Sequence, residues 1–341
     1  MGLIYKSVAD ANHEEEKFVP YEINGYLVQA PLAAAGGGNC KWGIVTKYGR
    51  KFFLKEFLSP KFPNLSADIS PAVREMQLKE CNEWLNKHTM VYNAIKDCNQ
   101  GNMVVPLDFF RFRNNFYLVT EYIESYDIKF EDICKTSFEQ KMILLKVLAH
   151  QFAPLAKKYV IHSDLKPDNL MLKKTLSDYL TVKIIDFDAS FLENDPPDAE
   201  DMVGDSVYFS PEAIYYQITE GEGKITPKAD IFSLGIIFHQ ILCGELPKIE
   251  SEEYDTIGEA VLNGERIILN EGLLPEFVSL IHQMLERDAS ERISAEDIWK
   301  KLKEIDGVPD SEQSLLPGDI LIRRTAQAQS DSEEWKASPS L

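Results

Sequence analysis

The chain has 341 residues, of which 44% are hydrophobic and 27% are charged. This balance is typical of a globular protein with enough apolar material for a buried core, and it excludes a chain that is disordered throughout. Asp and Glu number 55 against 36 Lys and Arg, which gives a formal net charge of −19. Negative charge in such excess argues against non-specific binding to nucleic acid or to anionic lipid, because their phosphates would be repelled.

The sequence shows no sign of membrane insertion or of export. No stretch approaches the roughly 20 apolar residues that a membrane-spanning helix needs, and the N-terminus lacks a basic start followed by an apolar core. The five cysteines are odd in number and form no close pair, which favours reduced thiols over a disulfide framework or a zinc site. We therefore expect a cytoplasmic protein without a membrane span, and its oligomeric state is left open.

The hydrophobic pattern changes from strand-like to helical along the chain. After a polar, acidic extension at 1–20, β-rich runs and one helical pattern predict a small β-rich lobe at 21–120, with Gly49 turning a hairpin. Helical patterns then predict a larger, mostly helical lobe at 124–305, with a cleft between the lobes. Periodicity ends at 306–341, where we expect a disordered tail. The expected strands are 26–32, 42–46, 51–57, 103–110 and 116–122, and the expected helices are 70–95, 137–158, 228–242, 275–287 and 295–305.

The strongest chemical signal is a polar loop at residues 161–170, between an apolar helix and a strand. It holds Asp164, Lys166 and Asn169 at offsets that suit phosphoryl transfer. Asp164 can accept a hydrogen bond from an attacking hydroxyl, and Lys166 can neutralise charge on the transferred group. The carbonyl oxygen of Asn169 is a hard ligand for Mg²⁺. Further on, Asp186 ends an apolar run, and we expect it to be the second metal ligand.

These residues resemble the motifs of a eukaryotic-type serine/threonine protein kinase, and the resemblance runs over about 26–305. It implies an α+β, bilobal protein-kinase-like fold. The matching motifs are the catalytic loop, the DFG element, the APE element, the acid that braces the loop and the arginine that pairs with the APE glutamate: His162-Ser163-Asp164, Asp186-Phe187-Asp188, Ser210-Pro211-Glu212, Asp230 and Arg292.

The same resemblance assigns phosphate-binding residues in the first half of the chain. Lys55 matches the strand lysine that holds the α and β phosphates. Its partner should be a helix glutamate, and we choose Glu80, with Glu83 as the alternative. A glycine cluster occupies the position of the phosphate-covering loop, where glycine lets backbone amides approach phosphate closely: Gly36, Gly37 and Gly38.

An adenine pocket also follows from the resemblance. Glu121 and Ile123 would form the hinge that offers backbone groups to adenine, with Thr120 as gatekeeper. Met171 would lie under the ring, while Trp42 and Phe53 would cover it. Phe53 is bulky where the family usually has Ala, so the fit and identity of the nucleotide are left open.

Three residues depart from the family pattern. Ser163 replaces a common Arg, and Asp188 replaces the glycine of DFG. Asp205 stands where Thr is usual, so its contact to Asp164 or Lys166 should be made by a carboxylate. Residues 186–212 hold nine acids and no Lys or Arg, which suggests either a solvated loop or a docking surface for basic segments of a protein substrate.

The sequence therefore favours an ATP-dependent protein kinase that transfers phosphoryl groups to protein hydroxyls with Mg²⁺. Two alternatives remain. One is a pseudokinase that only binds and scaffolds, suggested by the irregular glycine loop and Phe53. The other is a small-molecule phosphotransferase of the aminoglycoside-kinase type, although such enzymes generally lack counterparts of the Ser-Pro-Glu element, Asp230 and Arg292.

Overall fold

The computed structural model describes residues 18–34, 40–64, 69–124, 126, 128–175 and 178–307. The chain divides into two units, the first made of Met1–Glu124 with Ile185–Phe191, and the second of Ser125–Ile184 with Leu192–Leu341. Strands dominate the first unit and helices the second, as the sequence pattern predicts. The short stretch Ile185–Phe191 groups with the first unit although it follows the catalytic loop in sequence. Among the described residues, no helix is both long and apolar enough to cross a membrane.

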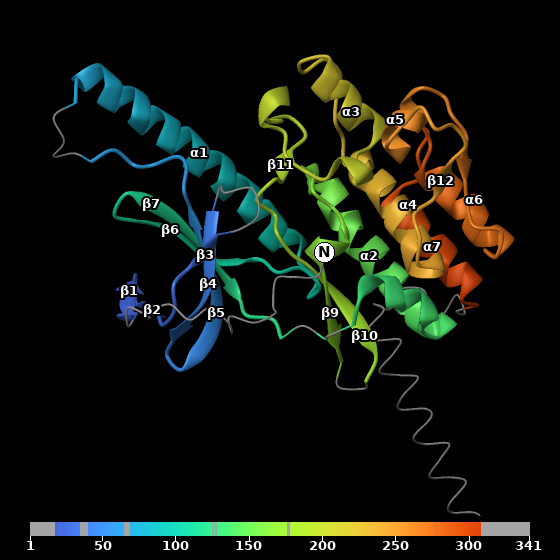
Figure 1. Cartoon of the computed structure of the whole chain (residues 1–341), viewed down its shortest axis with the longest axis horizontal. Helices are drawn as coiled ribbons and strands as arrows, with labels where there is room; N and C mark the ends of the chain where they lie inside the picture. Colours follow the sequence, from blue (N-terminus) through green and yellow to red (C-terminus); the bar gives the residue numbers. More distant parts are fainter. Residues whose placement is uncertain are drawn as a thin grey trace, which may run out of the picture. The chain divides into compact units, whose positions relative to one another are not determined.

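An antiparallel sheet forms most of the first unit (Figure 1). Its strands follow the order β1-β2-β4-β5-β7-β6, with β3 paired to β4. Tyr48 and Gly49 both have positive φ at the β4–β5 turn, +51° and +73°, which is the geometry of a tight two-residue hairpin and confirms the expected turn. The bounds are β1 Tyr21–Ile23, β2 Tyr26–Val28, β3 Ala33–Ala34, β4 Cys40–Lys47, β5 Arg50–Phe57, β6 Pro106–Phe112 and β7 Asn115–Glu121.

The two faces of this sheet differ in chemistry, because side chains alternate along each strand. One face carries the core of the unit, where Val45, Leu54 and Val119 are fully buried. On the other face, Trp42 lies opposite Lys55 on the neighbouring strand and Phe53 lies opposite Thr120. The register therefore places on one face the residues that the sequence associates with nucleotide binding.

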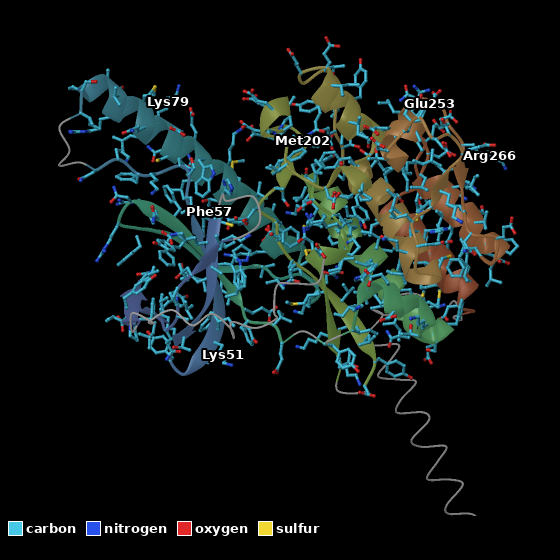
Figure 2. The ribbon with its side chains drawn as sticks, in the orientation of Figure 1. Lys51, Phe57, Lys79, Met202, Glu253 and Arg266 are labelled. Atoms are coloured by element: carbon cyan, nitrogen blue, oxygen red, sulfur yellow. The ribbon has the colours of Figure 1, made fainter. Side chains whose placement is uncertain are left out.

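Helix α1 (Pro71–Cys98) lies beside this sheet. It begins after Ser70, whose Oγ accepts a hydrogen bond from the Val73 amide at 3.3 Å, and Pro71 takes the first helical position. Trp84 packs against Phe57, with ring centroids 5.0 Å apart. Figure 2 labels Phe57 among the strands and Lys79 on α1, where the lysine side chain is 74% exposed.

The second unit is built around α4 (Lys228–Cys243), which is buried on nearly every side and packs against α2, α3 and α6. The three other helices expected in this unit, α2, α6 and α7, are confirmed. Helix α2 begins after its N-cap Ser137 and ends one residue early, α6 ends three residues early, and α7 has the expected bounds. The other elements are η1 Phe130–Lys135, α2 Phe138–Lys157, β8 Val160–Ile161, η2 Pro167–Asn169, β9 Leu170–Lys174, β10 Leu180–Ile184, β11 Phe191–Leu192, η3 Ala199–Asp201, η4 Ser206–Tyr208, α3 Pro211–Ile218, β12 Lys248–Ile249, α5 Ile257–Leu262, β13 Ile267–Ile268, α6 Pro275–Met284 and α7 Ala295–Ile305.

Packing in the second unit extends one residue past the expected boundary at 305. Asp306 is the C-cap of α7, and its carboxylate forms an ion pair with Lys146 on α2. Both side chains are largely shielded from solvent, with 6% of Lys146 and 13% of Asp306 exposed. Asp306 is thus part of the folded unit, although we expected it in the tail. Residues 308–341 and the extension 1–17 lie outside the described residues.

Candidate active site

The catalytic-loop residues that the sequence singled out converge on Asp164. Lys166 Nζ lies 2.9 Å from the Asp164 carboxylate. Asn169 Nδ2 donates to the backbone carbonyl of Asp164 at 2.7 Å and to Asp164 Oδ2 at 3.0 Å. These bonds fix the orientation of a carboxylate that keeps 18% of its side chain exposed, so Asp164 is both held in place and accessible.

The same hydrogen bonds orient the Asn169 amide. Because its nitrogen faces Asp164, its oxygen points elsewhere, and that oxygen accepts no hydrogen bond from the residues that the structure describes. Asn169 is 6% exposed. A carbonyl oxygen presented in this way is a chemically suitable ligand for a hard cation.

Asp230 on α4 holds the backbone of the catalytic loop. Its carboxylate accepts hydrogen bonds from the backbone amides of His162 at 2.8 Å and Ser163 at 3.2 Å. Ser163 has a φ of +70°, a left-handed conformation that costs energy in a non-glycine residue and needs such support. Burial raises the pKa of Asp230 to about 7, although the two amide hydrogen bonds oppose this rise.

Asp205 reaches the catalytic loop through its backbone and not through its side chain. Its amide donates to Asp164 Oδ1 at 3.1 Å, while its carboxylate accepts from the Val207 amide at 3.1 Å and caps η4. The expected carboxylate contact to Asp164 or Lys166 is therefore wrong. The physical reason is local: an Asp before a helical turn satisfies the free amide two residues on.

In the first unit, Lys55 of β5 lies between two carboxylates. Its Nζ is 2.9 Å from Asp186 Oδ1 and 2.6 Å from Asp188 Oδ2, and its side chain is 11% exposed. Burial alone would lower the pKa of Lys55, but the charges of Asp188 and Asp186 outweigh it and raise that pKa above its ordinary value. Lys55 is accordingly held as an ammonium ion.

Asp188 also contacts α1. The Tyr92 hydroxyl donates to Asp188 Oδ1 at 3.2 Å, and Tyr92 is only 2% exposed. Burial raises the pKa of Asp188, with the charge of Lys55 acting in the opposite direction. Asp186 itself adopts φ +59°, and its side chain stays 39% exposed. The acid is thus bound to Lys55 through one oxygen and remains open to solvent.

Glu80 does not pair with Lys55, contrary to our expectation. Glu80 is exposed, and the alternative, Glu83, lies 3.8 Å from Lys79 on the outer side of α1. Tyr92 is the residue of α1 that reaches the Lys55 cluster, and Glu80 precedes it by twelve positions, about 18 Å along a helix. Trp84, one turn after Glu80, packs against Phe57 and Phe116, which pair with each other at one end of the β5–β7 ladder.

The residues expected around adenine are distributed as follows. The rings of Trp42 and Phe53 stack on each other, with centroids 5.5 Å apart and planes 23° apart. Glu121 ends β7 and Ile123 is buried. Met171 belongs to β9 in the second unit. The three glycines of the expected phosphate loop, Gly36, Gly37 and Gly38, lie outside the described residues.

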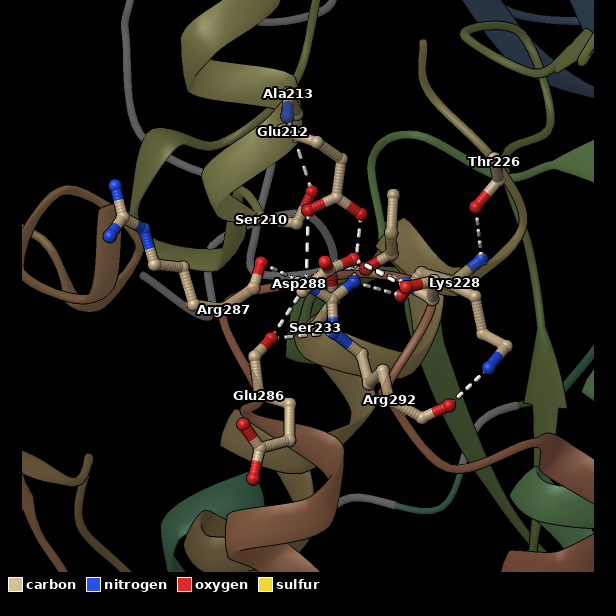
Figure 3. A network of polar contacts seen from close by, with 12 residues as sticks. Ser210, Glu212, Ala213, Thr226, Lys228, Ser233, Glu286, Arg287, Asp288 and Arg292 are labelled. Atoms are coloured by element: carbon tan, nitrogen blue, oxygen red, sulfur yellow. Dashed lines mark hydrogen bonds and ion pairs between the residues drawn. The ribbon is translucent and has the colours of Figure 1, made fainter. Parts of the chain in front are cut away.

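A buried ion pair fixes Glu212, the last residue of the segment 186–212. Arg292 Nη1 lies 2.7 Å from Glu212 Oε1, and Nη2 donates to Oε2 at 3.0 Å (Figure 3). The same guanidinium donates to the backbone carbonyls of Glu286 and Lys228. Arg292 is 1% exposed. The pairing implied by the Ser-Pro-Glu element is therefore formed.

Comparison with known families gives a match to the protein kinase domain over residues 66–302. The chain belongs to the protein kinase domain family. The expected α+β protein kinase fold is thereby confirmed. The matched range includes Asp164, Asp186 and Arg292. Lys55 precedes this range, so its assignment is argued from its contacts with Asp186 and Asp188.

Curated relatives are also protein kinases. The chain is 27% identical to Calcium-dependent protein kinase 27 of Arabidopsis thaliana over 83% of this chain and 57% of that protein. It is 26% identical to Serine/threonine-protein kinase unc-51 of Caenorhabditis elegans over 67% of this chain and 27% of that protein. It is 32% identical to Serine/threonine-protein kinase atg1 of Dictyostelium discoideum over 48% of this chain and 23% of that protein. The chain thus spans little more than half the length of these kinases at most.

Sequence reasoning missed Asp188 as a partner of Lys55. The spacing gave no usable signal: Asp188 follows Asp186 by two positions, but Asp186 has a φ of +59°, so the side-chain alternation of a strand does not apply here. We interpreted Asp188 only as a lost glycine. The role of Tyr92 carried no signal either, because a tyrosine on an apolar helix stripe is usually a core residue.

Proposed function

We propose that this chain is an ATP-dependent serine/threonine protein kinase that transfers the γ-phosphoryl group of ATP to a protein hydroxyl with Mg²⁺. The observation that carries the proposal is the joint orientation of Lys166 and Asn169 around the Asp164 carboxylate. A carboxylate fixed by its neighbours and still accessible is suited to accept a hydrogen bond from the attacking hydroxyl.

Each residue has a role in this proposal. Asp164 would orient the substrate hydroxyl and accept its proton as the new oxygen–phosphorus bond forms and ADP leaves. Lys166 would neutralise charge on the transferred group, and Lys55 would hold the α and β phosphates. Asn169 and Asp186 offer one carbonyl and one carboxylate oxygen, which are donors that Mg²⁺ prefers. Bound Mg²⁺ would supply charge neutralisation on the phosphates.

The acidic segment suggests a class of substrate. Residues 186–212 carry nine acids and no Lys or Arg, and Asp198 and Glu200 among them are exposed. We propose that protein substrates with basic segments dock here by charge complementarity. Peptides with Lys or Arg around the acceptor serine should then be phosphorylated faster than matched acidic peptides, and the preference should weaken as salt is added.

The decisive experiment is a transfer assay with purified protein, Mg²⁺, labelled ATP and a general protein substrate. Wild type should label the substrate, and Asp164→Ala should not. Nucleotide binding without labelling by either protein would favour the pseudokinase alternative. Labelling of an aminoglycoside in place of protein would favour the small-molecule phosphotransferase, an alternative against which the Arg292–Glu212 pair stands.

A further inference from the structure

The lysine that would hold the phosphates obtains its partners without any glutamate of α1. The described part of α1 has four acidic residues, and all of them are exposed: Glu75, Glu80, Glu83 and Asp97. The partners of Lys55 are instead Asp186 and Asp188, both from the stretch that follows β10. The shorter of the two contacts, 2.6 Å, is the one to Asp188.

Asp188 connects three parts of the first unit. One carboxylate oxygen contacts Lys55 on β5, and the other accepts a hydrogen bond from the hydroxyl of Tyr92 on α1 at 3.2 Å. Tyr92 is itself fixed by packing, because its ring meets Phe109 with centroids 5.0 Å apart. A carboxylate bound through both oxygens by a strand and a helix has little freedom to turn away from Lys55.

The two acids around Lys55 differ in their exposure and in their contact with α1. Asp186 is 39% exposed, whereas Asp188 is 23% exposed and contacts both Lys55 and Tyr92 of α1. If Asp186 turns toward a metal ion, as our proposed function requires, Asp188 is the acid that stays with Lys55.

We infer that Asp188 is the positioning residue for Lys55 and does the work that a helix glutamate would otherwise do, with Tyr92 holding it in place. The inference rests on the proposed role of Lys55 in binding ATP phosphates. It makes the residue after Phe187 a necessary part of the nucleotide site, where a glycine would leave Lys55 without this partner. It also explains how α1 can lack a buried acid.

The test measures nucleotide affinity as well as turnover. Asp188→Asn keeps the size of the side chain and removes its charge, so we expect ATP to bind about tenfold more weakly, the effect of one charge-assisted hydrogen bond. The KM for ATP should rise by a similar factor. The matched control is Asp255→Asn, which removes an exposed acid outside residues 186–212 and should change neither value.

A double-mutant cycle then shows whether Asp188 acts through Lys55. In a Lys55→Met background, Asp188→Asn should weaken ATP binding no further. Moving the carboxylate to the helix, in Asp188→Gly with Tyr92→Glu, should recover most of the affinity that Asp188→Gly alone loses. Unchanged affinity in Asp188→Asn, or an equal loss with and without Lys55, would overturn the inference.

The outcome is separable from that of the proposed function. If wild type binds ATP but transfers no phosphate, the proposed kinase activity fails, while the affinity cycle still decides the role of Asp188. If the variants lose thermal stability without losing affinity, Asp188 is merely structural and the inference is wrong.

Discussion

Charge balance around Lys55 determines what a substitution there would do. The sequence resemblance assigns Lys55 to the α and β phosphates, with a helix glutamate as its expected partner. The structure instead places its ammonium 2.9 Å and 2.6 Å from two carboxylates, with 11% of the side chain exposed. Removing the cation leaves two acids facing each other without the charge that holds them together.

Lys55→Met should therefore abolish phosphoryl transfer and also destabilise the protein. We expect a loss of about 2 kcal/mol of unfolding free energy, less than the roughly 3–5 kcal/mol of a fully buried pair, because Asp186 is 39% exposed. Urea unfolding measures the loss. Adding Asp188→Asn should restore part of the stability and none of the activity. Full stability in the single variant would contradict the contacts described.

The Asp230 carboxyl gives a stability effect that depends on pH. Its folded pKa of about 7 lies above the ordinary value, so between about pH 4 and pH 7 the folded chain binds more protons at this site than the unfolded chain. Stability from this group is present at the acidic side of that window and is lost as the pH rises through it, by at most about 1.4 kcal/mol per pH unit.

Asp230→Asn isolates this effect, because the amide does not titrate. The unfolding free energy of wild type minus that of the variant should fall between pH 4.5 and pH 7 and level off above it. Urea unfolding at several pH values measures the difference. A difference that stays flat, or rises, would show that Asp230 is ionised throughout.

At the scale of elements, the Ser-Pro-Glu turn is joined to the loop before α7 by Arg292. Its guanidinium bonds the Glu212 carboxylate through both terminal nitrogens and also holds the carbonyls of Glu286 and Lys228. Arg292→Ala should therefore lower the unfolding free energy more than Glu212→Ala does, and we expect a loss of roughly 3–5 kcal/mol for Arg292→Ala.

The double variant should lose less stability than the sum of the two single variants, because each single change already breaks the same pair. Thermal and urea unfolding provide the three values. As a matched control, the exposed pair Lys79–Glu83, 3.8 Å apart, should show a coupling of about 0.5 kcal/mol or less. Additive losses at Glu212 and Arg292 would mean that the pair contributes nothing.

The elements also show what the sequence could and could not predict. Long periodic segments such as α4 and the hairpin around Gly49 were predictable, because their patterns are local. The proximity of Asp164, Lys166 and Asn169 was predictable as well, because they lie within five residues of one another, and their catalytic roles stay a prediction. Helix α5 was not predicted, because its six residues are too few to show a helical period in the sequence. The Lys55 cluster joins residues more than ninety positions apart, and no local pattern encodes which acid approaches the lysine.

At the scale of the whole molecule, the contact of Asp306 with Lys146 decides where the folded part ends. We propose that the kinase domain includes Asp306, so a chain ending at Gly307 should unfold at the same temperature as the full chain. Asp306→Asn in that shorter chain should lower the unfolding temperature, because the carboxylate that pairs with the shielded Lys146 is lost. Calorimetry compares the three proteins. If the shorter chain and its Asp306→Asn variant unfold at the same temperature, the folded domain ends at residue 305.

The charge of residues 186–212, which run from the DFG element to the APE element, predicts that phosphorylation there does not activate the protein. Ser163 stands where an arginine would grip a phosphorylated loop, and its buried Oγ makes no hydrogen bond with the described residues. The only hydroxyl between Asp188 and Gly204 is that of Ser190, and nine acids already crowd residues 186–212. A phosphate added there would meet repulsion and no basic partner in the catalytic loop, so it should not order the segment.

Phosphatase-treated protein should consequently phosphorylate a substrate as fast as untreated protein. Ser190→Ala together with Ser206→Ala should also leave the rate unchanged, and Asp164→Ala serves as the inactive control. Intact mass measurements confirm that the treated sample carries no phosphate. The prediction is wrong if the treated enzyme is slower and activity returns with a phosphate mapped to Ser190 or Ser206, because a cation outside the catalytic loop must then accept that phosphate. Lys224, which lies 2.5 Å from Glu193 and is 69% exposed, would be the first residue to replace in that case.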